Sequence, residues 1–508
     1  MSRFAIRNTS TALVLIGLAS PAFAELTAQE VWDGIEQAMQ SYGYTVSGDE
    51  RATSNGLSVT DVSMVIELPE DSSRIAFEIP ELSLAENRNG SVLMTFPDTM
   101  PIAISAKTED GELVEMRLDY ANTGLEMTVS GEARNLVYDY VADALSITLE
   151  EMSVNDRPVG RQEAQFRMAM SGIAGSANTL TGAGSQITQS VTAQEASYHF
   201  AFRDPDTEES GLMSGSVSGL SIDSATNLPE GFDSSDPSSL ADSDFSAEGT
   251  MSYSGGELQF AADDGSGTNG GTISSESVSL SFGMDPTALN YEARVINQAF
   301  NMSGPEFPVP ISVNMGESAF NVTVPIAAAD APQDVAFGMK FAGFEMSQLI
   351  WNMIDPGSAL PRDPATIAID LTGQATPFIN LFDPASVTQL EQTGGMPGEL
   401  NALTLNDLTI EAAGAKIGGS GSFTFDNSDL ETFGGVPRPS GGVDLTVDGA
   451  NGLIDKLIGM GLLTAEDAMG ARMMMSMFAV PGDGPDSLKS SLEINDQGHV
   501  LANGMRIQ

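Results

Sequence analysis

The stretch Phe320-Asn321-Val322-Thr323-Val324-Pro325-Ile326 indicates the fold class of this chain. Its apolar residues recur at every second position, and the polar residues Asn321 and Thr323 lie between them. Successive side chains of a β-strand point to opposite faces of the sheet. The stretch therefore predicts a strand with one apolar face and one face in water, which is typical of an antiparallel sheet.

The same alternation recurs along much of the chain, between turn signals rich in Asn, Asp and Gly. Further alternating sets are Val62/Met64/Ile66/Leu68, Ile102/Ile104, Leu125/Met127/Val129 and Val278/Leu280/Phe282, and the turn signals lie at 109–111, 122–124, 155–158 and 263–265. We expect a mainly β fold (β-rich α+β) with long antiparallel sheets and a few amphipathic helices. A closed sandwich core and an open groove for acyl chains both fit this pattern.

The N-terminal 24 residues have the order of a secretory signal peptide. Arg3 and Arg7 precede an apolar core at 12–19, and Ala22-Phe23-Ala24 supplies the small residues of a cleavage site. The apolar core is shorter than the roughly 20 residues that span a bilayer. We expect cleavage between Ala24 and Glu25, export to the periplasm, and no transmembrane segment in the mature chain.

The chain is strongly acidic, with a formal net charge of −49, and removal of the two leader arginines leaves −51. No Lys or Arg lies between Arg203 and Arg294. Nucleic acids and anionic membrane surfaces both require clustered basic side chains, so we expect neither as a partner. The chain contains no cysteine, which excludes disulfides, thiol chemistry and iron–sulfur ligation.

Composition divides the chain into four segments. After the signal peptide at 1–24, residues 25–226 form a β-rich region that begins with a helix at 26–42, where Thr27 and Glu30 have the spacing of a capping box. Residues 227–246 form an acidic loop or linker rich in Ser, Asp and Pro. Residues 247–508 form a second β-rich region.

Two strand–helix–strand units are predicted in the C-terminal region. One has strands at 336–341 and 366–371 with a helical segment at 345–353 between them. The other has strands at 443–447 and 487–494 with helical segments at 452–463 and 465–478 between them. Each unit contains a proline-rich loop before its second strand, and such units usually pack together to bury a shared face. The chain then ends in a hairpin with turns at Asn495–Gly498 and Asn503-Gly504.

This terminal hairpin and the segment Gly449–Leu457 resemble an exported bacterial family known as a domain of unknown function, family 2125. The resemblance implies a leader, a β-rich body and a helix-then-hairpin C-terminus. The stretch Thr404–Asp426, with Gly418-Gly419-Ser420-Gly421 before Phe423 and Phe425, is similar to the strand repeats of AsmA-like envelope proteins. Neither resemblance implies catalytic residues.

Motifs for catalysis, metals and cofactors are weak, and we expect no catalytic residue, metal or cofactor. The two histidines, His199 and His499, lie in a predicted strand and in the terminal hairpin. The motif Gly265-x-Gly267-x-x-Gly270 is followed by a predicted strand, whereas a dinucleotide-binding loop requires a helix there. The acidic pairs Asp233/Asp236 and Asp242/Asp244 lack the spacing of a calcium loop, although oxygen ligands for a divalent cation stay an open alternative.

Methionines are concentrated in the predicted helix at 465–478. Met473, Met474 and Met477 suit either an irregular core, which we expect, or an adaptable apolar ligand surface. The sequence favours a non-enzymatic binding or scaffold protein of the envelope, whose partner is a lipid or another envelope protein. A periplasmic hydrolase that uses carboxylates and an outer-membrane-associated β protein stay open as alternatives.

Overall fold

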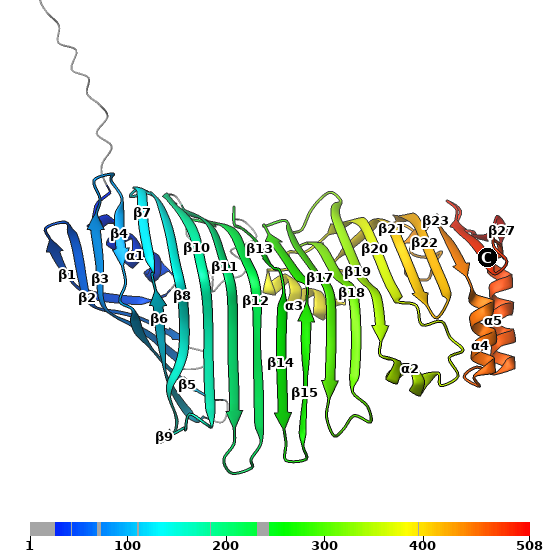
Figure 1. Ribbon diagram of the computed structural model, residues 1–508. Coiled ribbons are helices and arrows are strands. Elements are labelled where there is room, and N and C mark those ends of the chain that lie inside the picture. The colour runs from blue at the N-terminus through cyan, green and yellow to red at the C-terminus, as the bar shows by residue number, and fades with distance from the viewer. Residues whose placement is uncertain are drawn as a thin grey trace, which may run out of the picture.

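A computed structural model describes residues 26–41, 43–68, 73–108, 111–182, 184–230, 243–394 and 396–507. Within these ranges the strands join into one antiparallel sheet that runs the length of the molecule (Figure 1). The predicted β-rich α+β fold with antiparallel pairing is confirmed. The predicted signal peptide and its cleavage residues Ala22, Ala24 and Glu25 lie outside the described residues.

The strands follow one another across the sheet from the N-terminal end to the C-terminal end. The strands of the N-terminal part are β1 (Thr45–Thr53), β2 (Gly56–Leu68), β3 (Ser73–Glu86), β4 (Val92–Thr95), β5 (Thr99–Lys107), β6 (Leu113–Thr123), β7 (Glu126–Glu132), β8 (Asn135–Val154) and β9 (Arg157–Pro158). Those of the middle are β10 (Ala164–Gly182), β11 (Gly184–Arg203), β12 (Ser210–Pro229), β13 (Ser246–Tyr253), β14 (Gly256–Asp263), β15 (Thr268–Ser275), β16 (Ser277–Met284), β17 (Ala288–Ser303), β18 (Ile311–Pro325) and β19 (Gln333–Met346). Those of the C-terminal part are β20 (Ala365–Pro377), β21 (Gly398–Ala412), β22 (Ala415–Asp426), β23 (Arg438–Asp448), β24 (Val480–Pro481), β25 (Ser487–Ile494), β26 (Val500–Ala502) and β27 (Met505–Arg506).

The helices of the described ranges are short and lie at the ends of strands. They are α1 (Ala28–Ser41), α2 (Gln348–Ile354), α3 (Pro384–Thr393), α4 (Ala450–Gly459) and α5 (Ala465–Phe478). α1 begins with the predicted capping box, because the Glu30 amide donates to Thr27 Oγ1 while the Thr27 amide donates to Glu30 Oε2. None of the described helices is long and apolar enough to cross a membrane.

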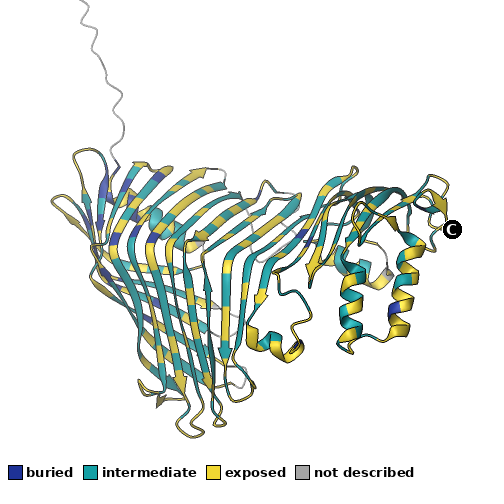
Figure 2. Ribbon diagram, turned by 45° about the vertical axis from the view of Figure 1, so that its right-hand side comes forward, coloured by how far each residue is buried: buried dark blue, intermediate teal, exposed yellow. Residues whose placement is uncertain are grey.

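Several long strands bend in the middle, as Figure 2 shows. Each bend contains a residue with a positive φ: Gly172 in β10 (58°), Gly219 in β12 (60°) and Asn297 in β17 (49°). A left-handed residue interrupts the extended backbone and redirects the strand, and glycine and asparagine adopt this conformation most readily. The bend divides the sheet into two arms. The first arm includes β13 and β16, the second includes β14 and β15, and β12 and β17 run through both.

The best-packed core lies at the N-terminal end, where α1 covers one face of the sheet. Val31 and Trp32 of α1 are fully buried there against Val59, Leu82 and other apolar residues of β2–β4 and β7–β8. Gly48 of β1 permits this contact, since a Cβ atom at that position would lie 2.7 Å from Val59 and 3.6 Å from Trp32.

The other segments singled out by the sequence also have defined places. The Gly265–Gly270 motif is the hairpin loop between β14 and β15, as expected. Both strand–helix–strand units are present, because α2 connects the paired strands β19 and β20, and α4 and α5 connect the paired strands β23 and β25. Asn227 and Ser246, at the two ends of the acidic segment 227–246, are cross-strand partners in the same sheet. That segment therefore connects neighbouring strands of one sheet. Whether it also separates two domains stays a prediction.

Candidate functional site

A row of apolar residues crosses most of the sheet from strand to strand. We call it the central row, and each of its members is the direct cross-strand partner of the next. In order they are Leu57, Leu84, Met94, Met127, Tyr140, Gly175, Val191, Ile222, Met251, Leu280, Ala293, Phe320, Met339, Ile369, Leu408, Gly419 and Leu445. Cross-strand partners share one face of a sheet. Sixteen interstrand steps of about 4.8 Å each make this row about 75 Å long.

Two further apolar rows flank the central row in the C-terminal half of the first arm. One consists of Phe282, Tyr291, Val322, Phe337, Leu371, Leu405, Gly421, Val443 and Leu492. The other is apolar except for Ser318 and consists of Tyr253, Val278, Val295, Ser318, Phe341, Ile367, Ile410, Ile417, Val447 and Leu488. On the strands that they share with the central row, both rows lie two residues from it, except at Leu405, where a register shift separates it from Leu408 by three residues. All three rows therefore lie on the same face.

The second arm continues this surface with its own apolar rows. Phe166, Phe200, Met213, Phe260, Gly271, Met302 and Ile311 form one, and Met168, Tyr198, Gly215, Leu258, Ile273, Phe300, Val313 and Met346 form the other. The two arms meet at a small core of Ala142, Ile173 and Ala193. Leu145 and Met170 of the second arm and Tyr140 and Val191 of the first arm all pack against it. The rows of both arms therefore lie on one surface, which we call the apolar face.

Most of the apolar face is not covered by a second layer in the described structure. In the central row, Leu84 and Met94 under α1 are 1% and 2% exposed, whereas Phe320 is 36% exposed. Phe282, Phe337 and Phe341 in the first arm, and Phe200 and Phe300 in the second arm, are also more than a third exposed. Contiguous exposed apolar surface of this size is rare unless it binds a partner. Within the described residues, these strands therefore do not form a closed sandwich core.

The opposite face of the same strands is polar. One of its rows consists of Ser190, Asp223, Thr250, Ser281, Glu292 and Asn321. These residues line a broad, open hollow of about 950 Å³ together with Glu248. The sheet thus separates an acidic, hydrated face from an apolar one, and the contrast follows from the period of two along each strand.

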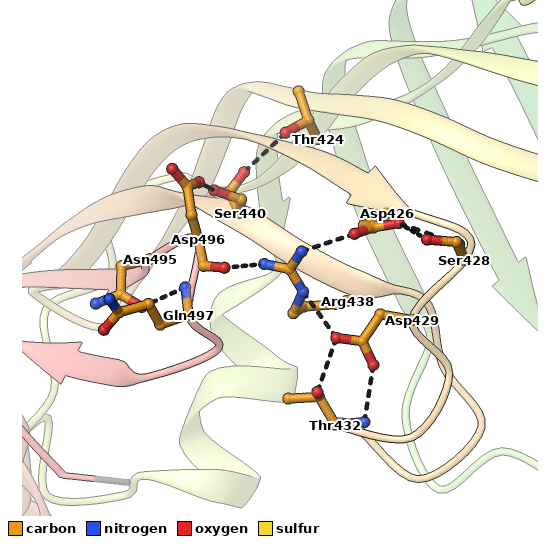
Figure 3. Close-up of polar contacts among 10 residues, drawn as sticks. All are labelled: Thr424, Asp426, Ser428, Asp429, Thr432, Arg438, Ser440, Asn495, Asp496 and Gln497. Atoms are coloured by element: carbon orange, nitrogen blue, oxygen red, sulfur yellow. Dashed lines mark hydrogen bonds and ion pairs between the residues drawn. The ribbon is translucent and has the colours of Figure 1, made fainter.

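A cluster of polar contacts surrounds Arg438 (Figure 3). The Arg438 guanidinium lies 2.7 Å from Asp426 Oδ2 and 2.9 Å from Asp429 Oδ2, and it also donates to the backbone carbonyl of Asp496. Ser440 Oγ donates to Asp496 Oδ1 at 2.6 Å. The cluster therefore connects the loop after β22 to the terminal hairpin, and its charged groups are engaged in holding that connection.

Hydrogen bonds keep several carboxylates of the described residues ionised. The Ser428 hydroxyl and the Arg438 guanidinium lower the pKa of Asp426, and the backbone amides of Leu360 and Ala359 lower the pKa of Asp355. A carboxyl that acts as a general acid requires the opposite, a raised pKa. Glu36 of α1 has one, because burial, Glu50 and Asp33 disfavour its charge. It belongs to the covered N-terminal end and not to the open apolar face.

The two histidines lie apart from the apolar face. His199 is the cross-strand partner of Arg167 and Ser214, on the polar side of the second arm. The His499 amide donates to Asn495 Oδ1 in the turn of the terminal hairpin. Among the described residues, no group of three or more His, Asp or Glu side chains is arranged to hold a metal ion. Of the acidic pairs that we considered for calcium, Asp233, Asp236 and Asp242 lie outside the described residues.

The methionines of α5 are exposed, and our expectation that they form a core is wrong. Met473, Met474 and Met477 are 61%, 59% and 56% exposed. In α5 only Ala468 is buried. The apolar surface of α5 is wider than the part that packs against α4. The outer methionines therefore have no neighbouring element to pack against in the described part of the chain.

The sequence did not reveal the rows of the apolar face. Each strand shows its own alternation, but the alignment of one strand with the next depends on turn lengths and register. The only sequence signal for these rows was the alternation of apolar residues within single strands, as at Val278–Phe282 and Phe320–Ile326.

Residues 237–507 match the model of the family described as "Uncharacterized protein conserved in bacteria (DUF2125)". No curated protein and no solved structure matches the chain. The similarity to AsmA-like strand repeats is not supported by these comparisons. The family match covers the C-terminal half of the apolar face and the α4–α5 hairpin.

Proposed function

This chain belongs to the bacterial DUF2125 family, and we propose that it binds the acyl chains of lipids along the apolar face of its sheet. The observation that carries the proposal is the central row, which stays apolar from strand to strand while its exposure rises from a few per cent under α1 to about a third at Phe320. A closed core would bury the whole row.

The dimensions of the apolar face suit flexible hydrocarbon chains. An acyl chain spans half of a bilayer core that is about 30 Å thick. The central row, at about 75 Å, is therefore long enough for several acyl chains end to end. The flanking rows widen the surface, so that more than one chain fits side by side. Burial of apolar surface supplies the driving force, at about 25 cal/mol per Å² removed from water.

The side chains of the apolar face favour a lipid over a rigid protein surface. Aromatic rings and methionines alternate with Leu, Ile and Val, and Met339 and Met251 belong to the central row itself. Thioether side chains are flexible and adapt to ligands of irregular shape. Polar groups that would fix the orientation of one particular partner lie on the opposite face.

We further propose that the chain acts in the periplasm after removal of residues 1–24. The arginines, apolar core and Ala22-Phe23-Ala24 order support export. N-terminal sequencing of protein from a periplasmic extract should then give Glu25 as the first residue. A product that retains Met1 would contradict the proposed location.

Native mass spectrometry of the protein purified from its own periplasm tests the proposed function. We expect adducts in the mass range of membrane lipids, and extraction with organic solvent should remove them and release identifiable lipid. A second envelope protein at fixed stoichiometry, with no lipid in the extract, would instead show that the apolar face is a protein interface.

A further inference from the structure

Two helical elements project from the same edge of the sheet. α2 follows the end of β19 and precedes the start of β20, and α4–α5 lies between the end of β23 and the start of β25. The start of β20 pairs with the end of β21, the end of β21 with the start of β22, and the start of β22 with the end of β23. This register places both connections at one edge, as Figure 1 shows.

Both elements expose large apolar side chains. Leu349, Met353 and Ile354 of α2 are at least half exposed. On α5, Met469, Met473 and Met477 recur every four residues, which places them on one face of the helix, and each is more than half exposed. Two separate connections at one edge thus carry the same kind of surface.

The two arginines of these elements are engaged within them, and the third cation is Lys456 of α4. Arg472 donates to Asp455 Oδ1 at 2.7 Å and to Asn451 Oδ1 at 3.2 Å. Arg362 donates to Ser358 Oγ at 2.9 Å and lies over the Trp351 ring at 5.6 Å. Between Met469 and Phe478 the sequence contains no charged residue except Arg472. The outer face of α5 is therefore uncharged over this stretch.

The apolar face extends to this edge. Its row through Phe341 and Ile367 ends at Leu488, which pairs with Pro481 of β24. α5 ends at Phe478, three residues before Pro481. The exposed methionines of α5 therefore come shortly before β24 in the chain, and β24 pairs with β25 at the end of the apolar face.

We propose that the edge formed by α2 and α5 rests on the surface of a neutral lipid bilayer, where acyl chains pass between the bilayer and the apolar face. This inference rests on the proposed function. Flexible apolar side chains enter the interfacial region of a bilayer without a matching shape. An anionic bilayer would repel this acidic chain, because binding to anionic lipids depends on clustered Lys and Arg, and Lys456 is an isolated cation in the α4–α5 connection.

Flotation of the mature protein with phosphatidylcholine vesicles tests the inference. The triple variant Met469→Ser/Met473→Ser/Met477→Ser should lower the partition coefficient at least about tenfold, because it removes the apolar surface that enters the interface. The matched control is Met396→Ser/Leu430→Ser/Val436→Ser. These residues are similarly exposed, and they lie in the β20–β21 and β22–β23 connections at the opposite edge. The control should bind vesicles as the unchanged protein does.

Three results would overturn the inference. The unchanged protein could fail to float with neutral vesicles, the two triple variants could lose binding equally, or vesicles with added phosphatidylglycerol could bind better at low salt. The edge could instead bind a second copy of this chain. Sedimentation velocity would show this if the methionine variant changed the oligomeric state and the unchanged protein bound no vesicles.

A dye-binding measurement without vesicles separates this inference from the proposed function. Saturable binding of an apolar dye with no flotation contradicts the bilayer contact alone. Absence of dye binding contradicts the proposed function itself.

Discussion

Phe320 on β18 and Phe337 on β19 contact each other edge to face, with ring centroids 5.9 Å apart and an interplanar angle of 84°. Phe320 also approaches Tyr291 of β17, at 6.1 Å. Such ring pairs usually lie in a core, yet both phenylalanines are more than a third exposed. A ladder of aromatic contacts therefore lies open along the apolar face, at the centre of the proposed lipid-binding surface.

Removal of a large ring should cost much more stability under α1 than on the open face. Trp32 is fully buried, so Trp32→Ala should lower the free energy of unfolding by about 3–5 kcal/mol. Phe320→Ala removes a ring that is already in contact with water and should cost about 1 kcal/mol or less. Urea unfolding followed by circular dichroism measures both. Equal losses would show that the face at Phe320 is covered in solution.

The acid stability of the α2 connection should depend on Asp355. Its carboxylate accepts hydrogen bonds from the amides of Ala359 (3.0 Å) and Leu360 (2.8 Å), which lower its pKa. A lowered folded-state pKa means that the stabilisation is present above the unfolded pKa of about 3.9 and is lost as the pH falls through the folded value.

Urea unfolding of the unchanged protein and of Asp355→Asn between pH 7 and pH 3 tests this dependence. The stability difference should be constant from pH 7 to about pH 4 and should shrink only at lower pH. A difference that declines between pH 7 and pH 5 would contradict the lowered pKa.

Neither histidine should be required for function. His199 lies on the polar side of the second arm, and His499 lies in a turn held by Asn495. The double variant His199→Asn/His499→Asn should complement a deletion strain as well as the unchanged gene does. Loss of complementation with an unchanged circular dichroism spectrum would instead favour a catalytic or metal-binding role.

Local signals in the sequence predicted much of the fold. The Thr27/Glu30 capping box marked the start of α1, and the Asn495–Gly498 turn marked the terminal hairpin, because each depends on residues close together in the chain. The alternation at Val278–Phe282 and Phe320–Ile326 predicted β16 and β18 in the same way.

The open apolar face could not be predicted, because it depends on what packs against a strand and not on the strand itself. An apolar stripe looks the same in sequence whether a second sheet covers it or water does, as the contrast between Leu84 and Phe320 in one row shows. The methionines of α5 were expected in a core for the same reason. The bends at Gly172 and Gly219 join the faces of the two arms, but an isolated glycine in a strand does not specify the direction of a bend.

Lipid binding along the apolar face is best tested by titration of the mature protein with an environment-sensitive apolar dye, with displacement by extracted phospholipid. Phe320→Ser/Phe337→Ser should weaken dye binding about tenfold or more, because it removes two rings of the apolar face. The control Asn321→Ala/Thr323→Ala changes neighbouring residues of β18 that belong to the polar face, and it should leave binding unchanged. We expect saturable dye binding that lipid displaces and that only the phenylalanine variant loses. An unchanged protein that binds no dye, or equal losses in both variants with the fold retained, would contradict lipid binding along the apolar face.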